Sequence, residues 1–402
     1  MRAWRHDIHR HPEIAFQETR TAAFVEERIR DFARESGAEI EVASGLAGTG
    51  IVATLHGDQS TDLPQAHPGQ RVIGLRAELD ALPMAEANDF AHRSRHDGCM
   101  HACGHDGHTA MLLGALRHLA HTRRFAGTVH CIFQPAEENE GGARVMVEEA
   151  GLFERFPVEA IFGMHNWPGL PAGQIAVQPG PVMAAYDHFD LRLTGKGGHA
   201  AMPHQGRDPI VLAAQTVQAF QTIASRGDPL DSVALSVTQI NAGDAYNIIP
   251  NEAVLKGTVR SFRPETQQAV EARMREIVAG LCAAAGAEFA FEYQHGYPAT
   301  VNSARESEFV ARYVADRFGS DVLVRDYPPS TGSEDFAFML QKRPGCYVKL
   351  GAGVGPGLHN PRYDFNDEIL GRGAAYWVGL VERYLHPDHS TDASGPAFFA
   401  EI

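Results

Sequence analysis

The sequence of 402 residues has no apolar run near the roughly 18 residues that cross a bilayer, so it predicts no membrane-spanning helix. Its first residues are polar and rich in histidine, without the apolar region of a secretory signal peptide. Its five cysteines are scattered and odd in number, which argues against a disulfide framework and favours a reducing cytoplasm. Basic side chains are the minority, with 35 Lys and Arg against 50 Asp and Glu. The net charge of -15 argues against nucleic acid or an anionic membrane as the main partner.

What the sequence does contain is enough apolar material for a large core and an unusual number of histidines. Hydrophobic residues make up 44% of the chain, and its length predicts two domains. Many of the 21 histidines stand beside Cys, Asp or Glu, so metal chemistry has to be considered.

The first part of the chain alternates strands with helices. The spacing of apolar residues predicts helices at 19–34, 108–122 and 141–151, and strands at 50–57, 71–83, 128–135 and 159–168. This alternation is typical of an α/β sheet, in which functional residues gather where strands end.

A different order begins near residue 185. Strands are predicted at 188–195, 231–243, 252–262 and 288–294, with helices at 208–225 and 265–286. The resulting β-α-β-β-α-β order is typical of a ferredoxin-like α+β sandwich. We therefore expect a discontinuous α/β catalytic domain, formed by residues 1–184 and 299–402, with an inserted lid or dimerisation domain at residues 185–298.

One short segment carries the strongest metal-ligand pattern. Cys103 and His105 lie two residues apart in a glycine-containing turn just before a predicted helix. A thiolate and an imidazole that reach the same site suit zinc and its neighbours in the first transition row. The segment alone is also compatible with an inert core cysteine and a histidine that caps the helix.

Two consecutive carboxylates follow another strand. Glu137 and Glu138 should point in opposite directions if their backbone is extended, so that one could bind metal while the other stays free as a base. Metal-assisted hydrolysis needs this division of roles. Taken alone, the pair could equally belong to a solvated acidic loop.

Two further histidines complete a possible ligand set. His165 lies at a strand end, and His359 lies in a loop that enters the last helix. Each of them alone is more often structural. Together, one cysteine, three histidines and one glutamate at strand-to-loop transitions of one domain can fill two metal sites.

Motifs along most of the chain resemble one known family. The resemblance runs from the first residues to about Glu382 and is carried by RAELDALP, ANDFAHRSRHDGCMHACGHDGHTAML, FQPAEE, GMHNWP, GKGGHAAMPH, NIIPNEA, GTVRSF, STGSEDFAFM and LHNPRYDFND. These segments resemble the hippurate hydrolase and indole-acetyl-amino-acid hydrolase group of the aminoacylase-like co-catalytic metallopeptidases. The resemblance implies a metal-dependent amidohydrolase that cleaves the amide bond of N-acyl amino acids.

The resemblance also implies a role for each residue of the metal-ligand pattern. It implies two divalent metal ions per subunit, bridged by the Cys103 thiolate. It assigns the remaining ligands to His105, Glu138, His165 and His359. It makes Glu137 the general base and acid. Zinc, manganese, cobalt and nickel are all compatible with these ligands.

Three residues of the inserted domain match substrate-binding positions. The resemblance implies that His199 reaches the substrate carbonyl, often across a dimer interface, and that Asn247 and Arg260 hold the substrate's polar end. A guanidinium suits a carboxylate because it can donate two parallel hydrogen bonds. The structural alternatives are a turn histidine for His199 and a surface strand arginine for Arg260.

The sequence departs from the family at one position. Glu78 stands where the family commonly has Asp, two residues before Asp80. A carboxylate at Asp80 could take part in catalysis by orienting a ligand histidine, or could only cap the turn at Pro83.

We therefore predict a cytoplasmic enzyme that acts on a small N-acyl amino acid, has no nucleic acid or membrane partner, and forms a homodimer or homotetramer. A dipeptidase or other exopeptidase, or an N-acetyl-diaminopimelate deacetylase, on the same scaffold is the alternative among enzymes. The alternative of another class is a metal- or ligand-binding protein without catalysis.

Overall fold

The computed structural model describes residues 1–58, 71–138 and 140–386, and the chain forms two compact units. Unit 1 contains Met1–Gly180, Asn302–Tyr327 and Phe338–Ile402. Unit 2 contains Pro181–Val301 and Pro328–Ala337. The last of these segments was expected in the second part of the catalytic domain but groups with unit 2.

Unit 1 is built on a mixed sheet of eight strands in the order β1-β2-β4-β3-β5-β16-β6-β15. Their bounds are β1 Ile40–Leu46, β2 Gly50–His56, β3 Val72–Glu78, β4 Thr128–Gln134, β5 Ala160–Pro168, β6 Ile175–Ala176, β15 Leu323–Val324 and β16 Gly345–Gly353. The central strands β4, β3, β5 and β16 run parallel. Their carboxyl ends therefore share one edge of the sheet, where side chains from distant parts of the chain can meet.

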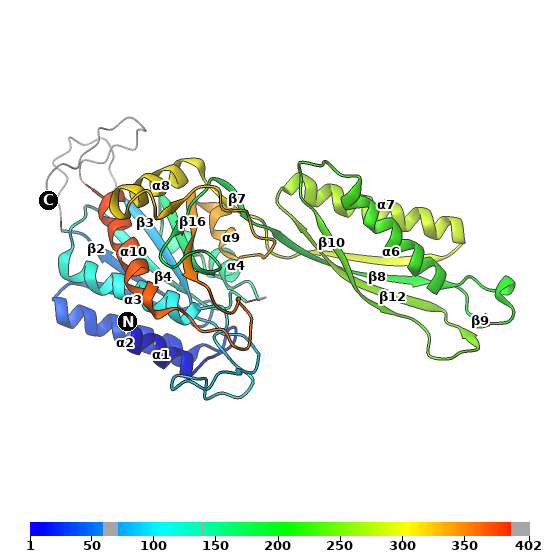
Figure 1. Cartoon of the computed structure of the whole chain (residues 1–402), viewed down its shortest axis with the longest axis horizontal. Coiled ribbons are helices and arrows are strands. Elements are labelled where there is room, and N and C mark those ends of the chain that lie inside the picture. Colours follow the sequence, from blue (N-terminus) through cyan, green and yellow to red (C-terminus); the bar gives the residue numbers. More distant parts are fainter. Residues whose placement is uncertain (59–70, 139, 387–402) are drawn as a thin grey trace. The chain divides into compact units, whose positions relative to one another are not determined.

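The helices of unit 1 are α1 Arg2–Arg10, α2 Thr19–Ser36, α3 His105–Thr122, α4 Gly142–Arg144, α5 Leu152–Arg155, α8 Ala304–Phe318 and α10 Leu370–Tyr384, with a π-helical turn at Val145–Glu149. Helix α9, Phe336–Lys342, begins with two residues that group with unit 2. Helices α2, α3 and α8 contact the strands of the sheet, and α1 and α10 contact α3. Helix α3 lies between α2 and α10 (Figure 1), and most of its residues are buried. It begins at His105, three residues earlier than predicted, so this histidine lies in the first helical turn.

Unit 2 has an antiparallel sheet in the order β10-β12-β8-β13, covered on one face by two helices. The elements are β8 Ala185–Thr194, α6 Pro209–Ser225, β10 Ala234–Asn241, β12 Glu252–Ser261, α7 Pro264–Ala285 and β13 Glu288–His295, with the short pair β9 Gly198–His199 and β11 Ile248–Ile249 at its margin. Buried and accessible residues alternate along β8 and β12, as expected for a sheet with one covered face. The predicted fold class, an α/β unit interrupted by a ferredoxin-like α+β unit, is confirmed.

The N-terminal segment, for which the sequence predicted no element, forms α1. Arg5 and His9 of this helix are fully buried. Arg5 Nε lies 2.9 Å and His9 Nδ1 lies 2.8 Å from the same carboxylate oxygen of Asp106, in the first turn of α3. This ion cluster joins α1 to α3 at Asp106, the residue that follows His105. Among the described residues, no helix has the length and hydropathy needed to cross a membrane.

Replacing Arg5 with Leu should destabilise unit 1 by about 3 kcal/mol, because it leaves the buried charge of Asp106 with fewer compensating partners. Arg2→Leu on the same helix should cost less than about 1 kcal/mol, because the Arg2 side chain is 67% exposed and its ion pair with Asp367 is solvated. Urea unfolding followed by tryptophan fluorescence measures this, since Trp4, Trp167 and Trp377 all belong to unit 1. Equal unfolding midpoints for the two variants would contradict the structural role of the buried cluster.

Candidate metal centre

Cys103 lies in the tight turn that leads into α3. Gly104 follows it with φ 92°, a left-handed conformation that favours glycine. A Cβ atom at Gly104 would lie 2.3 Å from the side-chain nitrogen of Asn166, so the turn also needs glycine for space. The turn places the Cys103 thiol, which is buried, next to the end of β5.

The structure brings the five predicted metal ligands together around this thiol. Cys103 Sγ lies 3.3 Å from His165 Nε2. The ligand atoms of Cys103, His105 and His165 lie within 4.8 Å of one another, and so do those of Cys103, Glu138 and His359. Cys103 therefore belongs to two groups of three possible ligands each. We call these groups the two triads.

The loop that carries His359 is attached to the turn of Cys103 by its backbone. The His359 N–H donates to the carbonyl of Ala102 at 2.8 Å, and His359 itself has φ 61°. Its Nε2 lies 3.1 Å from a carboxylate oxygen of Glu138. A residue 256 positions from Cys103 thus becomes part of the cluster.

Glu137 and Glu138 do not point in opposite directions as predicted. Their carboxylate oxygens and a ring nitrogen of His105 all lie within 4.8 Å of one another, with Glu137 Oε2 3.8 Å from His105 Nε2. The extended geometry assumed from the sequence ends at Gln134, and Ala136 adopts φ 54°. Both carboxylates consequently face the same imidazole.

Asp80 lies beside His105. Its Oδ1 is 3.2 Å from His105 Nδ1, its backbone carbonyl is 2.9 Å from the same nitrogen, and its Oδ2 accepts the N–H of Glu138 at 2.9 Å. Burial alone would raise the pKa of Asp80, but the hydrogen bond and charge of His105 lower it. These contacts correspond to the first alternative for Asp80, in which it orients a histidine.

A second buried network, which no sequence motif indicated clearly, supports the turn of Cys103. His108 Nδ1 lies 2.8 Å from a carboxylate oxygen of Glu78, and His108 Nε2 accepts the backbone N–H of Asn166 at 2.9 Å. The Asn166 amide donates to the carbonyl of Cys103 at 2.8 Å. The longer side chain of Glu78 therefore still reaches His108. Only these contacts with Glu78 and Asn166, which depend on the folded structure, distinguish His108 from the neighbouring histidines in the sequence.

The chemistry of the cluster fits a transition-metal cation. Sulfur, imidazole nitrogen and carboxylate oxygen are all available as donors. His105 Nε2 is buried and has no hydrogen-bond partner in the described part of the chain. Burial and the charge of the neighbouring Glu138 raise the pKa of the Cys103 thiol. A divalent cation would offset this negative charge and favour the thiolate.

The three predicted residues of the inserted domain, His199, Asn247 and Arg260, belong to unit 2 and not to the unit of the metal cluster. His199 is exposed and pairs with Ile248 between β9 and β11. The carbonyl of Asn247 accepts the N–H of Ala200 at 3.0 Å. His199 and Asn247 are therefore neighbours at the margin of unit 2, whereas Arg260 lies on its main sheet.

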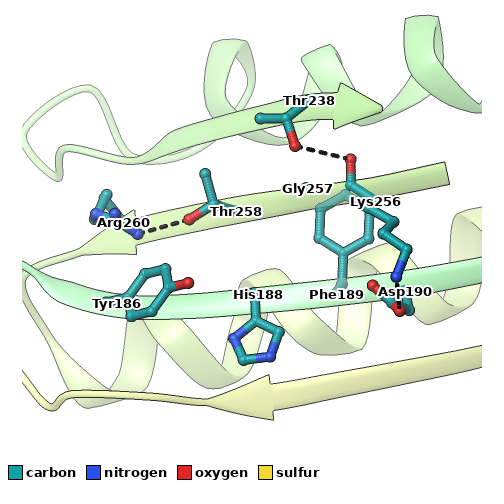
Figure 2. A pocket seen from close by; sticks show the side chains of 9 residues that line it. All are labelled: Tyr186, His188, Phe189, Asp190, Thr238, Lys256, Gly257, Thr258 and Arg260. Carbon is teal, nitrogen blue, oxygen red and sulfur yellow. Dashed lines mark hydrogen bonds and ion pairs between the residues drawn. The ribbon is translucent and has the colours of Figure 1, made fainter. Parts of the chain in front are cut away.

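Arg260 projects from the face of this sheet that the helices leave uncovered (Figure 2). Its guanidinium carbon lies 4.3 Å from the ring centroid of Tyr186, and its Nη1 donates to Thr258 Oγ1 at 2.6 Å. No carboxylate of the described residues lies within ion-pair distance of it. Burial lowers the pKa of Arg260, which still leaves the guanidinium cationic at neutral pH. These residues and His188 line a shallow pocket.

An α/β unit with sulfur, nitrogen and oxygen donors clustered where its parallel strands end has the organisation of a metal-dependent hydrolase. The chain belongs to Peptidase family M20/M25/M40, which matches residues 74–383. The family expected from the sequence motifs is thereby confirmed.

Individual relatives cover nearly the whole chain. The hippurate hydrolase of Campylobacter jejuni is 36% identical over 95% of this chain and 95% of its own. The N-acetylcysteine deacetylase of Bacillus subtilis is 39% identical over 94% of each chain. Among solved structures, the YXEP protein of Bacillus subtilis, described as a dinuclear metal binding peptidase of the M20 family, is 35% identical with a TM-score of 0.81 and covers 96% of this chain and 97% of that one.

Replacing Cys103 with Ser should weaken the binding of added Co²⁺ or Zn²⁺, because it removes the donor common to both triads. In the wild-type protein, metal at about 100 times its dissociation constant should stabilise unit 1 by about 2.7 kcal/mol. Cys99→Ser is the matched control, since Cys99 belongs to neither triad. Thermal unfolding with and without added metal measures this stabilisation in the wild-type protein and in the two variants. A metal-dependent stabilisation as large in Cys103→Ser as in the wild-type protein would exclude the thiol as a ligand.

Proposed function

We propose that this protein is a metal-dependent amidohydrolase that cleaves N-acyl amino acids to a carboxylic acid and a free amino acid. The observation that carries the proposal is the sharing of Cys103 by two triads, with the carboxylate of Glu137 beside them. The names of the relatives support the substrate class, because hippurate and N-acetylcysteine are both N-acylated amino acids.

The two triads would each hold one divalent ion, with Cys103 bridging them. One ion would then be bound by His105 and His165, and the other by Glu138 and His359. A mixed set of thiolate, imidazole and carboxylate suits zinc, manganese, cobalt or nickel. The description of the YXEP protein as dinuclear supports the number of ions.

The bound ions would supply a water molecule of lowered pKa and polarise the amide carbonyl. Glu137 would accept the proton of this water and later donate it to the departing amine. Asp80 would hold His105 in one orientation through its hydrogen bond to Nδ1. Asp80, the second carboxylate near the ligands, would thus orient His105 and would not transfer a proton.

Residues of unit 2 would recognise the substrate. His199 would donate a hydrogen bond to the carbonyl oxygen as negative charge develops on it. Asn247 and Arg260 would hold the carboxylate of the amino-acid part, for which the guanidinium of Arg260 has the appropriate charge and geometry. His199 would come from the partner subunit of a homodimer or of a homotetramer, and the enzyme would act in the cytoplasm.

A panel of substrates on protein loaded with each metal tests the function as a whole. Hippurate and N-acetyl amino acids should be hydrolysed, and free dipeptides should not. Preferred cleavage of dipeptides would favour the exopeptidase alternative, and stable metal binding without turnover of any acyl amino acid would favour a binding protein.

Glu137→Gln should lower kcat by at least about 100-fold while the protein keeps its full metal content, because the amide cannot accept a proton. Glu140→Gln is the control, since Glu140 is exposed in the same turn and belongs to no ligand group. Kinetics together with elemental analysis measure the two properties. Substantial turnover in Glu137→Gln would remove Glu137 from the role of base.

Arg260→Met should raise the KM for an N-acyl amino acid and lower kcat/KM by roughly 10- to 100-fold, the value of a hydrogen-bonded charge pair. The loss should be much smaller for the same substrate with its carboxylate converted to an amide. Lys256→Met is the matched control, because Lys256 lies on the same strand but pairs with Asp190 at 2.7 Å. Equal losses on the acid and on the amide would exclude carboxylate recognition by Arg260.

A further inference from the structure

The turn that carries Glu137 has a conformation that its own sequence does not favour. The chain leaves β4 at Gln134, and Ala136 adopts φ 54°. A residue with a Cβ atom rarely occupies this left-handed region, so the surroundings must impose it. The Ala136 carbonyl accepts the N–H of Gly142 at 2.8 Å, which closes the turn on one side.

A buried carboxylate from the N-terminal part of the chain holds the other side of Ala136. Glu18, the residue before α2, is fully buried. Its Oε1 accepts the N–H of Ala136 at 2.9 Å and the N–H of Phe16 at 3.0 Å. Its Oε2 accepts the hydroxyl of Thr49 at 2.6 Å. The carboxylate thus connects three separate segments, of which one leads directly into Glu137.

Glu137 is bracketed by two such contacts. The preceding residue, Ala136, donates its N–H to Glu18, and the following residue, Glu138, donates its N–H to Asp80 at 2.9 Å. Asp80 also contacts His105 and so belongs to the cluster itself. Glu18 forms no hydrogen bond or ion pair with a predicted ligand among the described residues, and its hydrogen bond from the Ala136 N–H ties it to the turn that carries Glu137.

We propose that Glu18 is a positioning residue for Glu137, which fixes the base by holding the N–H of Ala136 and thereby the left-handed turn. The inference rests on the proposed role of Glu137. Without this hydrogen bond the turn can relax toward ordinary backbone angles, and the Glu137 carboxylate leaves its place near His105. Misplacement of a reacting group by about 1 Å can cost on the order of 100-fold in rate.

Two conservative substitutions separate the reach of the side chain from its charge. Glu18→Gln keeps the length and an acceptor oxygen for Ala136 but has no charge. Glu18→Asp keeps the carboxylate but is one methylene shorter, so it cannot reach Ala136 without a shift of the backbone. Burial raises the pKa of Glu18 to about 7, although the hydrogen bond from Thr49 lowers it. The neutral amide of Gln can therefore replace the Glu18 carboxyl group as a hydrogen-bond acceptor.

We expect Glu18→Gln to keep kcat close to the wild-type value. Glu18→Asp should lose at least about 10-fold in kcat, with unchanged KM and full metal content, because only the placement of the base is altered. Thr49→Val is the matched control: it removes a hydrogen bond from the same carboxylate but leaves the bond to Ala136, and should keep kcat.

Hydrogen–deuterium exchange of the peptide that contains Ala136 gives a readout that does not depend on activity. The peptide should exchange faster in Glu18→Asp than in Glu18→Gln or Thr49→Val. Unchanged exchange in Glu18→Asp, or a kcat that falls in Glu18→Gln and not in Glu18→Asp, would overturn the inference. Failure of the proposed function has a different signature. Glu137→Gln would then remain active, while the peptide that contains Ala136 would still exchange faster in Glu18→Asp than in Glu18→Gln. Glu18 would in that case still position the turn, but the turn would not carry a catalytic base.

Discussion

The buried thiol of Cys103 is the point on which the rest of the candidate site depends. It belongs to both triads, so the donors supplied by α3, β5, the turn after β4 and the His359 loop all meet at one sulfur atom. Burial and the charge of nearby carboxylates raise the pKa of this thiol and so oppose its ionisation. A cation is the simplest source of the missing positive charge, and a thiolate is then a strong ligand for it.

The remainder of unit 1 keeps this arrangement in place. Glu78 and His108 hold Asn166, which in turn holds the carbonyl of Cys103. Asp80 holds both His105 and the backbone of Glu138. All of these contacts are buried except the hydrogen bond from Glu138, which is partly buried. In a buried environment a satisfied polar network gives a single geometry and a broken one is costly. The site is therefore rigid because of polar contacts behind the ligands as much as because of the ligands.

The residues expected as metal ligands stay a prediction, but the structure brings them together, and part of this convergence could be anticipated from where strands end. His165 lies near the end of β5 and Glu138 follows β4, and parallel strands bring such ends to one edge of the sheet, whereas Cys103 was singled out by its spacing from His105 in a turn before a helix. The ferredoxin-like order of unit 2 was also predicted from the sequence, since apolar and polar residues alternate along strands such as β8 and β12. Periodicity reports which face of an element is apolar, and the prediction of these strands and helices needed no more than that.

Other features could not be read in this way. The common direction of Glu137 and Glu138 depends on the left-handed backbone of Ala136, for which alanine carries no signal. Helix α1 was missed because its buried residues include Arg5 and His9, which are polar and are compensated by Asp106 far along the chain. Glu18 and His108 likewise act through partners that are distant in sequence. Long-range polar pairing leaves no periodic pattern.

The proposed function depends most on two metal ions that share the Cys103 sulfur. A crystal structure of the metal-loaded protein, with anomalous data collected at the metal absorption edge, tests it directly. We expect two anomalous peaks, each within coordination distance of Cys103 Sγ, about 2.3 Å for zinc. A single peak, or two peaks of which either lies away from that sulfur, would contradict it.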